Sequence, residues 1–323
     1  MFHTYDKWPE IAHYSYFETD NQIDFSDIDH IVFAGMGGSG ILGDVLSAII
    51  SKSDIHVKVV KGYLLPNTVD SKTLVVTTSI SGNTKETMTI LKNAAKTTCK
   101  LIAFSAGGEM QKFCSTHRIK HYSSSYHNSP RASFTSFLYS MLKTIGPIIK
   151  IKDSDVNESI HALEKQRKKI SYENLSDSNP AIELSKWITD IPIIYYPAGL
   201  YAAAFRFKNC IQENAKMHAM IENVIEASHN NVVAWERPSK IKPILLQGKD
   251  DYIKTKERWK IFKKYFQENA IEYKEIMSPN GSILTKLSSM IYFLDFVSIY
   301  VAVNNKLDPS PVNSIKYLKR YIK

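Results

Sequence analysis

The chain has 323 residues, a length that fits two compact domains of roughly 150 residues each. Its hydrophobic fraction of 44% and charged fraction of 23% are ordinary for a globular protein and exclude an intrinsically disordered one. The net charge of +9 permits an anionic partner without identifying one.

The cysteines and the N-terminal segment bear on where the protein works. Cys99, Cys114 and Cys210 are too few and too scattered for a disulfide framework or a zinc site. The first residues, MFHTYDKWPEIAHYSYF, lack the basic and apolar regions of a signal peptide. The longest apolar run, Met290 to Val303, contains Asp295 and is predicted to be a buried helix rather than a membrane span. We therefore expect a cytoplasmic protein that does not associate with a membrane.

The first half of the chain alternates short β-branched runs with helical patterns. This alternation predicts βαβ units and a parallel sheet flanked by helices. The expected strands are 31–34, 56–60, 74–79 and 100–105, and the expected helices are 38–50, 83–95, 130–149 and 156–170.

The second half repeats the alternation after a polar, turn-rich segment, Ser171 to Pro180. We expect two α/β domains of similar layout, residues 1–152 and 153–323, each a doubly wound, flavodoxin-like parallel sheet. The expected strands are 191–197, 242–248 and 273–277, and the expected helices are 200–217, 252–269, 282–303 and 311–322.

A glycine-rich turn, GMGGSG at Gly35 to Gly40, follows the first strand and opens a helix. The free N–H groups of a helix start, together with the Ser39 hydroxyl, can bind an anion. The spacing also matches the dinucleotide fingerprint G-x-G-x-x-G, but the second strand ends in Val60 and Lys61, without the carboxylate that the fingerprint requires. An anion site is therefore favoured over a nicotinamide site, and a tight turn with no ligand is the remaining alternative.

A loop rich in hydroxyl groups, TTSISGNTKET at Thr77 to Thr87, leaves the third strand and enters a helix. Ser79, Ser81 and Thr84 can all face an anion at the helix start. An ordinary helix cap, the alternative, needs only one hydroxyl. A phosphomonoester fits this loop better than a nucleotide, because no Walker lysine follows the glycines.

These two segments together resemble the sugar isomerase (SIS) domain, and four further segments occur in the order seen in bifunctional phosphoglucose/phosphomannose isomerases. The four are SPRASF (129–134), QENAK (212–216), EASHNN (226–231) and DPSPVNSIKYLK (308–319). The resemblance covers nearly the whole chain. It implies two SIS-type domains and interconversion of glucose 6-phosphate, and of mannose 6-phosphate, with fructose 6-phosphate. It further implies a metal-free cis-enediol mechanism without a cofactor.

The resemblance also implies roles for individual residues. The sugar phosphate is expected to bind Gly38, Ser39, Ser79, Ser81 and Thr84.

The expected catalytic residues divide between proton transfer and ring opening. Glu213 would shuttle the proton between C2 and C1, and Arg131 would stabilise the enediolate. His229, contributed across a homodimer interface, and Lys319 would open the ring. Lys316 is the alternative to Lys319.

Substrate specificity is expected to involve Ser310. The resemblance implies that this small hydroxyl residue leaves room for either C2 epimer.

The residues themselves support these roles unequally. Arg131 extends an inward-facing stripe of the helix predicted to begin at Pro130, so its guanidinium could face a cleft. The alternative is that its stem packs on the protein while the guanidinium reaches solvent. Lys319 shares one helix face with the apolar residues Val312, Ile315 and Ile322, and this face is predicted to point to the core. Burying an unpaired ammonium there would cost free energy, which favours a partner or a ligand beside Lys319. On sequence alone, Glu213 would be read as a solvated helix carboxylate and His229 as a surface loop residue.

Rival functions lack features that they would normally need. A non-catalytic sugar-phosphate sensor would normally carry a helix-turn-helix domain, and an amino-sugar isomerase a glutamine-hydrolysing domain. The sequence shows neither pattern. Nucleic acid is not an expected partner, because the basic residues are dispersed apart from the run Lys165 to Lys169.

Overall fold

A computed structural model describes residues 2–322 of the chain, which divide into two compact units. The N-terminal unit consists of His3–Glu164 together with Gly281–Leu287. The C-terminal unit consists of residues 165–280 and 288–322 together with Phe2. The predicted boundary after Lys152 lies at the start of helix α7 (Asp153–Ile170), whereas the units divide inside this helix.

Contacts of the first part of α7 explain why that part belongs to the N-terminal unit. Near its start, the Tyr16 hydroxyl donates to Asp153 (2.8 Å), and Ser159 and Tyr139 share a hydrogen bond (2.7 Å). The Glu158 carboxylate accepts from Ser282 and Thr285, which brings Gly281–Leu287 into the N-terminal unit.

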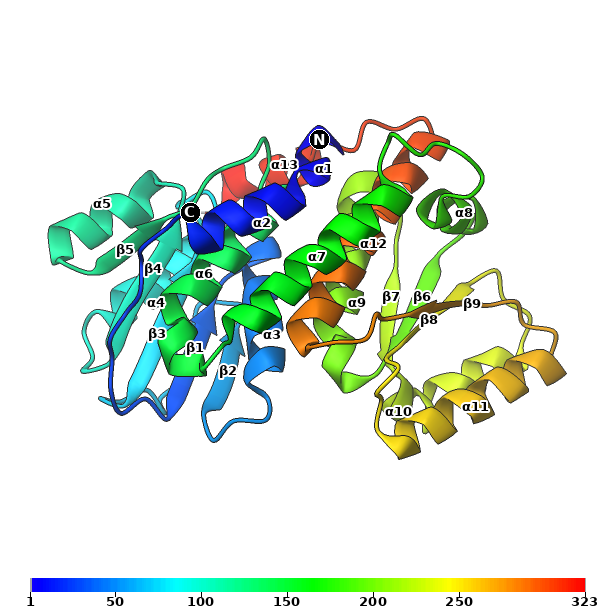
Figure 1. Cartoon of the computed structure of the whole chain (residues 1–323), viewed down its shortest axis with the longest axis horizontal. Helices are drawn as coiled ribbons and strands as arrows, with labels where there is room; N and C mark the ends of the chain where they lie inside the picture. The colour runs from blue at the N-terminus through cyan, green and yellow to red at the C-terminus, as the bar shows by residue number, and fades with distance from the viewer. Residues whose placement is uncertain (1, 323) are drawn as a thin grey trace. The chain divides into compact units, whose positions relative to one another are not determined.

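The N-terminal unit is built on a five-stranded parallel sheet in the order β2-β1-β3-β4-β5 (Figure 1). This is the flavodoxin-like order, and the direction of winding reverses between β1 and β3. Ala34 pairs with Thr77, so these two strands end side by side. The strands are β1 (His30–Ala34), β2 (His56–Val60), β3 (Thr73–Thr78), β4 (Lys100–Ser105) and β5 (Lys120–Ser123).

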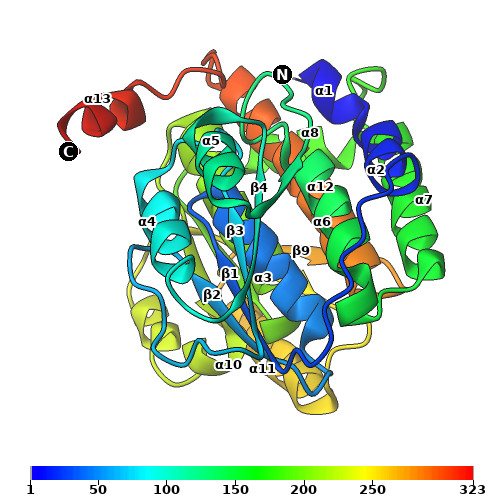
Figure 2. The same ribbon diagram turned by 90° about the vertical axis from the view of Figure 1, so that its left-hand side faces the viewer.

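Helices cover both faces of this sheet (Figure 2). A Cβ at Gly43 of α3 would meet Phe33 of β1, so α3 lies directly against one face. Ala94 of α4 packs with Val32 and Val75 on the opposite face, because neighbouring strand residues point to opposite sides. The helices are α1 (Phe2–Asp6), α2 (Trp8–Phe17), α3 (Gly38–Ile50), α4 (Lys85–Ala94), α5 (Gly108–His117) and α6 (Phe134–Ile149).

The C-terminal unit repeats the same strand order with four parallel strands, β7-β6-β8-β9. Two strands, β5 in the first sheet and β7 in the second, were not expected from the sequence. The strands are β6 (Pro192–Tyr196), β7 (Met220–Asn223), β8 (Lys242–Gln247) and β9 (Lys274–Met277). The predicted fold class, two doubly wound α/β domains, is confirmed.

An aromatic core covers one face of the second sheet. Tyr195 packs there with Trp235, Trp259, Phe262 and Phe266. Helices α9 and α12 lie on the other face (Figure 1). The helical elements are α8 (Pro180–Trp187), a 3₁₀ turn (Ala198–Leu200), α9 (Tyr201–Cys210), a π turn (Ile211–Ala215), α10 (Val224–Ala227), a 3₁₀ turn (Asn231–Glu236), α11 (Ile253–Glu268), α12 (Ile283–Asn304) and α13 (Asn313–Tyr321).

Helix α12 contains the apolar run that the sequence predicted to be buried. It is the one helix among the described residues that is long and apolar enough to cross a membrane, yet 78% of its most apolar window is buried in the protein. Asp295, in the middle of that run, is fully buried and forms an ion pair with Arg206 of α9. The prediction of a buried core helix is confirmed.

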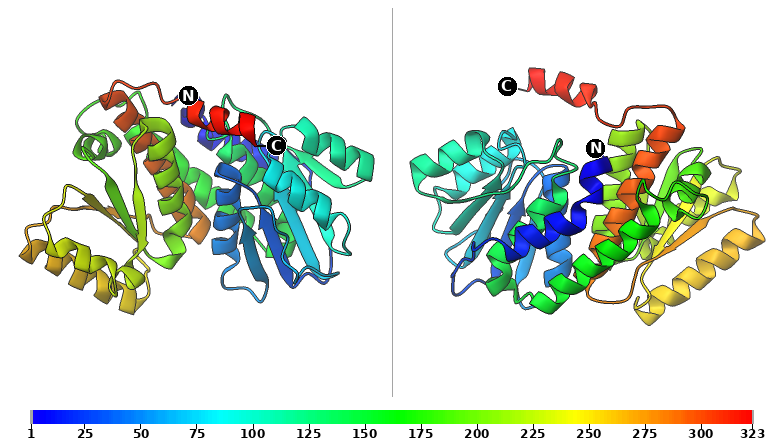
Figure 3. Two further views of the ribbon diagram at one scale, coloured as in Figure 1. Left: turned by 180° about the vertical axis from the view of Figure 1, so that it is seen from behind. Right: turned by 45° about the horizontal axis from the view of Figure 1, so that its top comes forward.

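Helix α13 corrects the prediction of a core-facing stripe near the C-terminus. No side chain of α13 is buried, and Ile315 and Ile322 are 41% and 39% exposed. A connector carries the helix away from the sheet of its own unit (Figure 3). The periodicity correctly predicted a helix, but it could not predict that no element of this unit covers its apolar side.

Candidate active site

The glycine-rich turn lies at the carboxyl end of β1, where α3 begins. Gly37 has φ 53°, a left-handed conformation that favours glycine, and Gly38 is the first residue of α3. The Ser39 hydroxyl accepts a hydrogen bond from the Ile80 N–H (3.2 Å), which joins the turn to the Ser/Thr loop after β3. A Cβ at Gly35 would come within 2.9 Å of the Ser39 carbonyl, so only glycine fits there.

The Ser/Thr loop gathers the predicted phosphate ligands beside this turn. The Ser79 hydroxyl is buried and donates to the Thr84 hydroxyl (2.9 Å), while Ser81 is exposed. Thr84 occupies the N-cap of α4, but its side chain makes no capping hydrogen bond. The ordinary-cap alternative therefore does not describe Thr84, and its hydroxyl is turned to Ser79 instead.

Two residues of the S-G-N-T sequence support the loop from the other side. Gly82 has φ 71°, and a Cβ there would overlap the Gly107 carbonyl in the turn before α5. The Asn83 side chain accepts from the Glu109 N–H (3.0 Å) at the start of α5. The Ser/Thr loop is thus held between the glycine-rich turn and the turn before α5, at the switch point where doubly wound sheets bind ligands.

A partly buried ion pair adjoins the glycine-rich turn, and the sequence analysis did not predict it. Lys61, directly after β2, lies 2.6 Å from Asp44 of α3. Burial raises the pKa of Asp44, and the Lys61 ammonium opposes that shift. A Cβ at Gly40 would touch the Lys61 side chain, so the pair packs against the turn. Lys61, at the end of the second strand, could have predicted this ion pair, but the sequence analysis used it only to show that a carboxylate is missing there.

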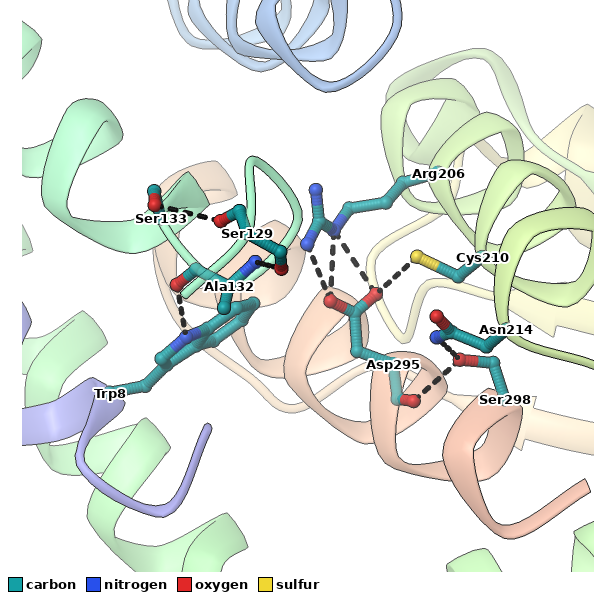
Figure 4. A network of polar contacts seen from close by, with 9 residues as sticks. All are labelled: Trp8, Ser129, Ala132, Ser133, Arg206, Cys210, Asn214, Asp295 and Ser298. Atoms are coloured by element: carbon teal, nitrogen blue, oxygen red, sulfur yellow. Dashed lines mark hydrogen bonds and ion pairs between the residues drawn. The ribbon is translucent and has the colours of Figure 1, made fainter. Parts of the chain in front are cut away.

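Arg131 also belongs to the N-terminal unit, and it is only 6% exposed. The burial expected from the apolar stripe is confirmed, but α6 begins at Phe134 rather than Pro130. Arg131 lies in a turn before the helix, where the Ser129 hydroxyl accepts from the Ala132 N–H (3.2 Å). The Trp8 indole N–H donates to the Ala132 carbonyl (Figure 4), which fixes the turn from α2.

Glu213 lies in the C-terminal unit, in the π turn that follows α9. The sequence predicted a continuous helix to Met217, whereas α9 ends at Cys210 and the π turn ends at Ala215, with Lys216 as its C-cap in a left-handed conformation. Such turns are frequent at functional sites. Glu213 is half-buried and lines a pocket of about 640 Å³, with Asn209, Gln212, Lys216 and residues 311–315.

A buried polar network lies behind this turn (Figure 4). Asp295 accepts from the Arg206 guanidinium at 2.5 and 3.1 Å and from the Cys210 thiol at 3.3 Å. Burial and the neighbouring Asp295 carboxylate raise the pKa of Cys210 well above its usual value. The Asn214 amide donates to the Ser298 hydroxyl (2.8 Å), so both the last turn of α9 and the π turn are joined to α12.

The structure does not bring His229 or Lys319 to this pocket. His229 is exposed after α10 and is absent from the pocket lining. Lys319 is exposed on α13, whereas Lys316 lines a neighbouring surface pocket with other α13 residues. Ser310 is exposed in the connector before α13, where its N–H donates to Asp308 (2.8 Å).

The predicted phosphate ligands are therefore together in one unit, and Glu213 and Ser310 are in the other. Within residues 2–322, His, Cys, Asp and Glu side chains form no group of three arranged to hold a metal ion.

Comparisons with known proteins agree with this two-unit organisation. The SIS domain model matches residues 24–142, and a model described as the bacterial phospho-glucose isomerase C-terminal SIS domain matches residues 177–322. The tagatose-6-phosphate ketose/aldose isomerase of Escherichia coli shares the fold, with a TM-score of 0.76 at 13% identity over 96% of this chain and 95% of that one.

Two relatives are similar over nearly their whole length, and both are named bifunctional phosphoglucose/phosphomannose isomerase. The protein from Caldicellulosiruptor bescii is 33% identical over 91% of this chain and 89% of its own. The protein from Aquifex aeolicus is 28% identical over 94% and 95%. The chain therefore belongs to the bifunctional phosphoglucose/phosphomannose isomerase family.

Proposed function

We propose that this protein is a cytoplasmic aldose–ketose isomerase that interconverts glucose 6-phosphate, and also mannose 6-phosphate, with fructose 6-phosphate. Its relatives carry that activity in their names, at up to 33% identity over most of the chain. The observation that carries the proposal is a carboxylate, Glu213, in the wall of a pocket large enough for a sugar phosphate. The separate cradle of hydroxyl groups after β1 and β3 suits the phosphate.

The proposed mechanism uses only side chains of the protein. The phosphate binds at Gly38, Ser39, Ser79, Ser81 and Thr84.

His229 and Lys319 assist ring opening. Glu213 then removes the C2 proton, and the electrons shift to the C1 carbonyl oxygen to form a cis-enediolate. Arg131 stabilises the negative charge, Glu213 returns the proton to C1, and the C2 hydroxyl gives up its proton while O1 gains one, which completes the ketose. Ser310 leaves room for either C2 epimer, and the reaction needs neither a metal nor a cofactor.

The proposal includes a homodimer in which His229 serves the site of the neighbouring subunit. Two features support it. His229 is exposed and lies outside the pocket of Glu213. Helix α13 exposes apolar side chains, including Leu318 and Tyr321 at 61% and 70%, and such surfaces often mark protein interfaces.

Glu213→Gln tests the catalytic assignment because it removes the base and keeps the side-chain size. Loss of a general base lowers kcat by about 10²- to 10⁴-fold. Coupled assays should offer glucose 6-phosphate and mannose 6-phosphate separately, with and without a chelator. Calorimetric titration with fructose 6-phosphate should show that the variant still binds, and exposed Glu173→Gln is the matched control.

The outcomes separate the proposal from its rivals. Wild-type kcat in Glu213→Gln would reject this residue as the base. Tight binding of fructose 6-phosphate by a wild-type protein without turnover would favour a sensor. Loss of activity in chelator would reject the metal-free mechanism.

A further inference from the structure

Lys216 is the C-cap of the π turn, and its side chain contacts a separate segment of the same unit. Its ammonium donates to the Glu213 carbonyl (2.5 Å), the Pro311 carbonyl (2.8 Å) and the Pro309 carbonyl (3.4 Å). An ammonium has three donors and no acceptor, so it can donate to all three of these carbonyls. Bonds from a charged donor are also stronger than bonds between neutral groups.

The acceptors lie in the connector, which we define as residues 305–312 between α12 and α13. Proline has no N–H and a restricted φ, so this Pro-Ser-Pro segment has little capacity to order itself through backbone hydrogen bonds. The Ser310 N–H is bound by Asp308. Lys216 lies outside the connector and donates to both of its proline carbonyls.

This contact joins the two sides of the Glu213 pocket. One side consists of Asn209, Gln212, Glu213 and Lys216, and the other of residues 311–315. On the opposite side of the π turn, Asn214 donates to Ser298 of α12. The turn that carries Glu213 is thus attached inward through Asn214 and outward through Lys216.

We propose that Lys216 is a positioning residue that holds the connector against the π turn and thereby sets the shape of the pocket around the Glu213 carboxylate. Its effect on catalysis rests on the proposed function, whereas its effect on the connector does not.

The test compares Lys216→Met, which keeps the stem and removes the ammonium, with Lys216→Arg. Exposed Lys260→Met on α11 is the matched control. Hydrogen exchange followed by mass spectrometry should show faster exchange over residues 305–321 in Lys216→Met than in the wild type or in Lys260→Met. A misplaced reacting group costs up to about 100-fold, so we expect kcat to fall about 10- to 100-fold in Lys216→Met. Lys216→Arg should recover part of both effects, and the melting temperature should change little.

Each outcome decides the inference. If Lys216→Met leaves hydrogen exchange over residues 305–321 unchanged, the proposal that Lys216 holds the connector is wrong, even if kcat falls. Faster exchange with wild-type kcat overturns the positioning role. If the wild-type protein shows no isomerase activity at all, the proposed function fails, and the exchange measurement still decides whether Lys216 holds the connector.

Discussion

The residues of the Ser/Thr loop fall into two groups, those suited to bind an anion and those that support the loop. The hydroxyl groups of Ser79 and Thr84 face one another at the end of β3, and their repetition in the sequence predicts that they bind an anion. Gly82 and Asn83 instead fit the loop against the turn before α5. The anion-binding role of the hydroxyls could be predicted from the sequence, because hydroxyls at a helix start suit an anion. The supporting role of Gly82 and Asn83 could not, because it depends on a neighbouring turn that only the folded sheet brings into contact.

A histidine behind that turn is expected to make the stability of the N-terminal unit depend on pH. The Ser105 hydroxyl contacts His121 Nε2 (2.7 Å) and donates to the Gly107 carbonyl (2.8 Å). Burial lowers the pKa of His121. At pH values between the pKa of His121 in the folded chain and its higher pKa in the unfolded chain, the unfolded chain binds more protons than the folded one. The free energy of unfolding is therefore expected to fall as the pH drops below about 6.5.

We expect His121→Gln to reduce this pH dependence. Urea unfolding between pH 7.5 and pH 5, which brackets the ordinary histidine pKa of about 6.5, should show a smaller loss of stability in the variant. His117→Gln, an exposed neighbour, is the control. An identical pH profile for His121→Gln and wild type would show that His121 does not contribute.

At the scale of elements, the π turn is the feature that places Glu213. The apolar and polar pattern of residues 200–217 predicted one uninterrupted helix, and it is correct as far as Cys210. The α-helix gives way to the π turn where Cys210 and Asn214 form hydrogen bonds with residues of α12, about 85 positions further along the chain. Local propensity carries no information about partners so distant in sequence.

The Arg206–Asp295 pair should be a major link between α9 and α12. Removing one partner of a buried ion pair costs about 3–5 kcal/mol, because a buried charge is left unpaired. We expect Asp295→Asn to destabilise the C-terminal unit by that amount, measured by urea unfolding with tryptophan fluorescence. Trp187, Trp235 and Trp259 all belong to this unit.

The double variant Arg206→Met/Asp295→Leu distinguishes charge from packing. Replacing both partners with apolar side chains is often nearly neutral. The double variant should therefore be more stable than Asp295→Asn. If it is less stable, packing rather than the unpaired charge explains the loss.

At the scale of the molecule, two sheets of the same strand order have diverged in chemistry. The loop after β3 presents hydroxyls, whereas the corresponding loop after β8 carries Asp251, which accepts from the Gly248 N–H and the Trp259 indole N–H (both 3.0 Å). A carboxylate would repel a phosphate at this position. This difference supports the proposal that each chain has one phosphate site, in its N-terminal unit.

The proposed dimer predicts complementation between two inactive variants. If each site takes Glu213 from one chain and His229 from the other, a heterodimer of Glu213→Gln and His229→Ala has one intact site. Random reassociation of equal amounts should then restore about a quarter of wild-type activity, since half of the dimers are mixed. The two variants are refolded together and assayed, and each variant refolded alone is the control. Recovery of no activity would mean that both groups come from one chain.

The sequence by itself determined the two α/β domains, the loops after the first and third strands and the identity of the hydroxyl, guanidinium and carboxylate groups. These features depend on short-range periodicity and on local residue types. The tertiary structure decided the π turn at Glu213, the Lys61–Asp44 pair beside the glycine-rich turn, the attachment of the connector by Lys216 and the exposure of α13. All four depend on contacts between residues remote in the chain or on the absence of a covering element, neither of which leaves a local pattern in the sequence.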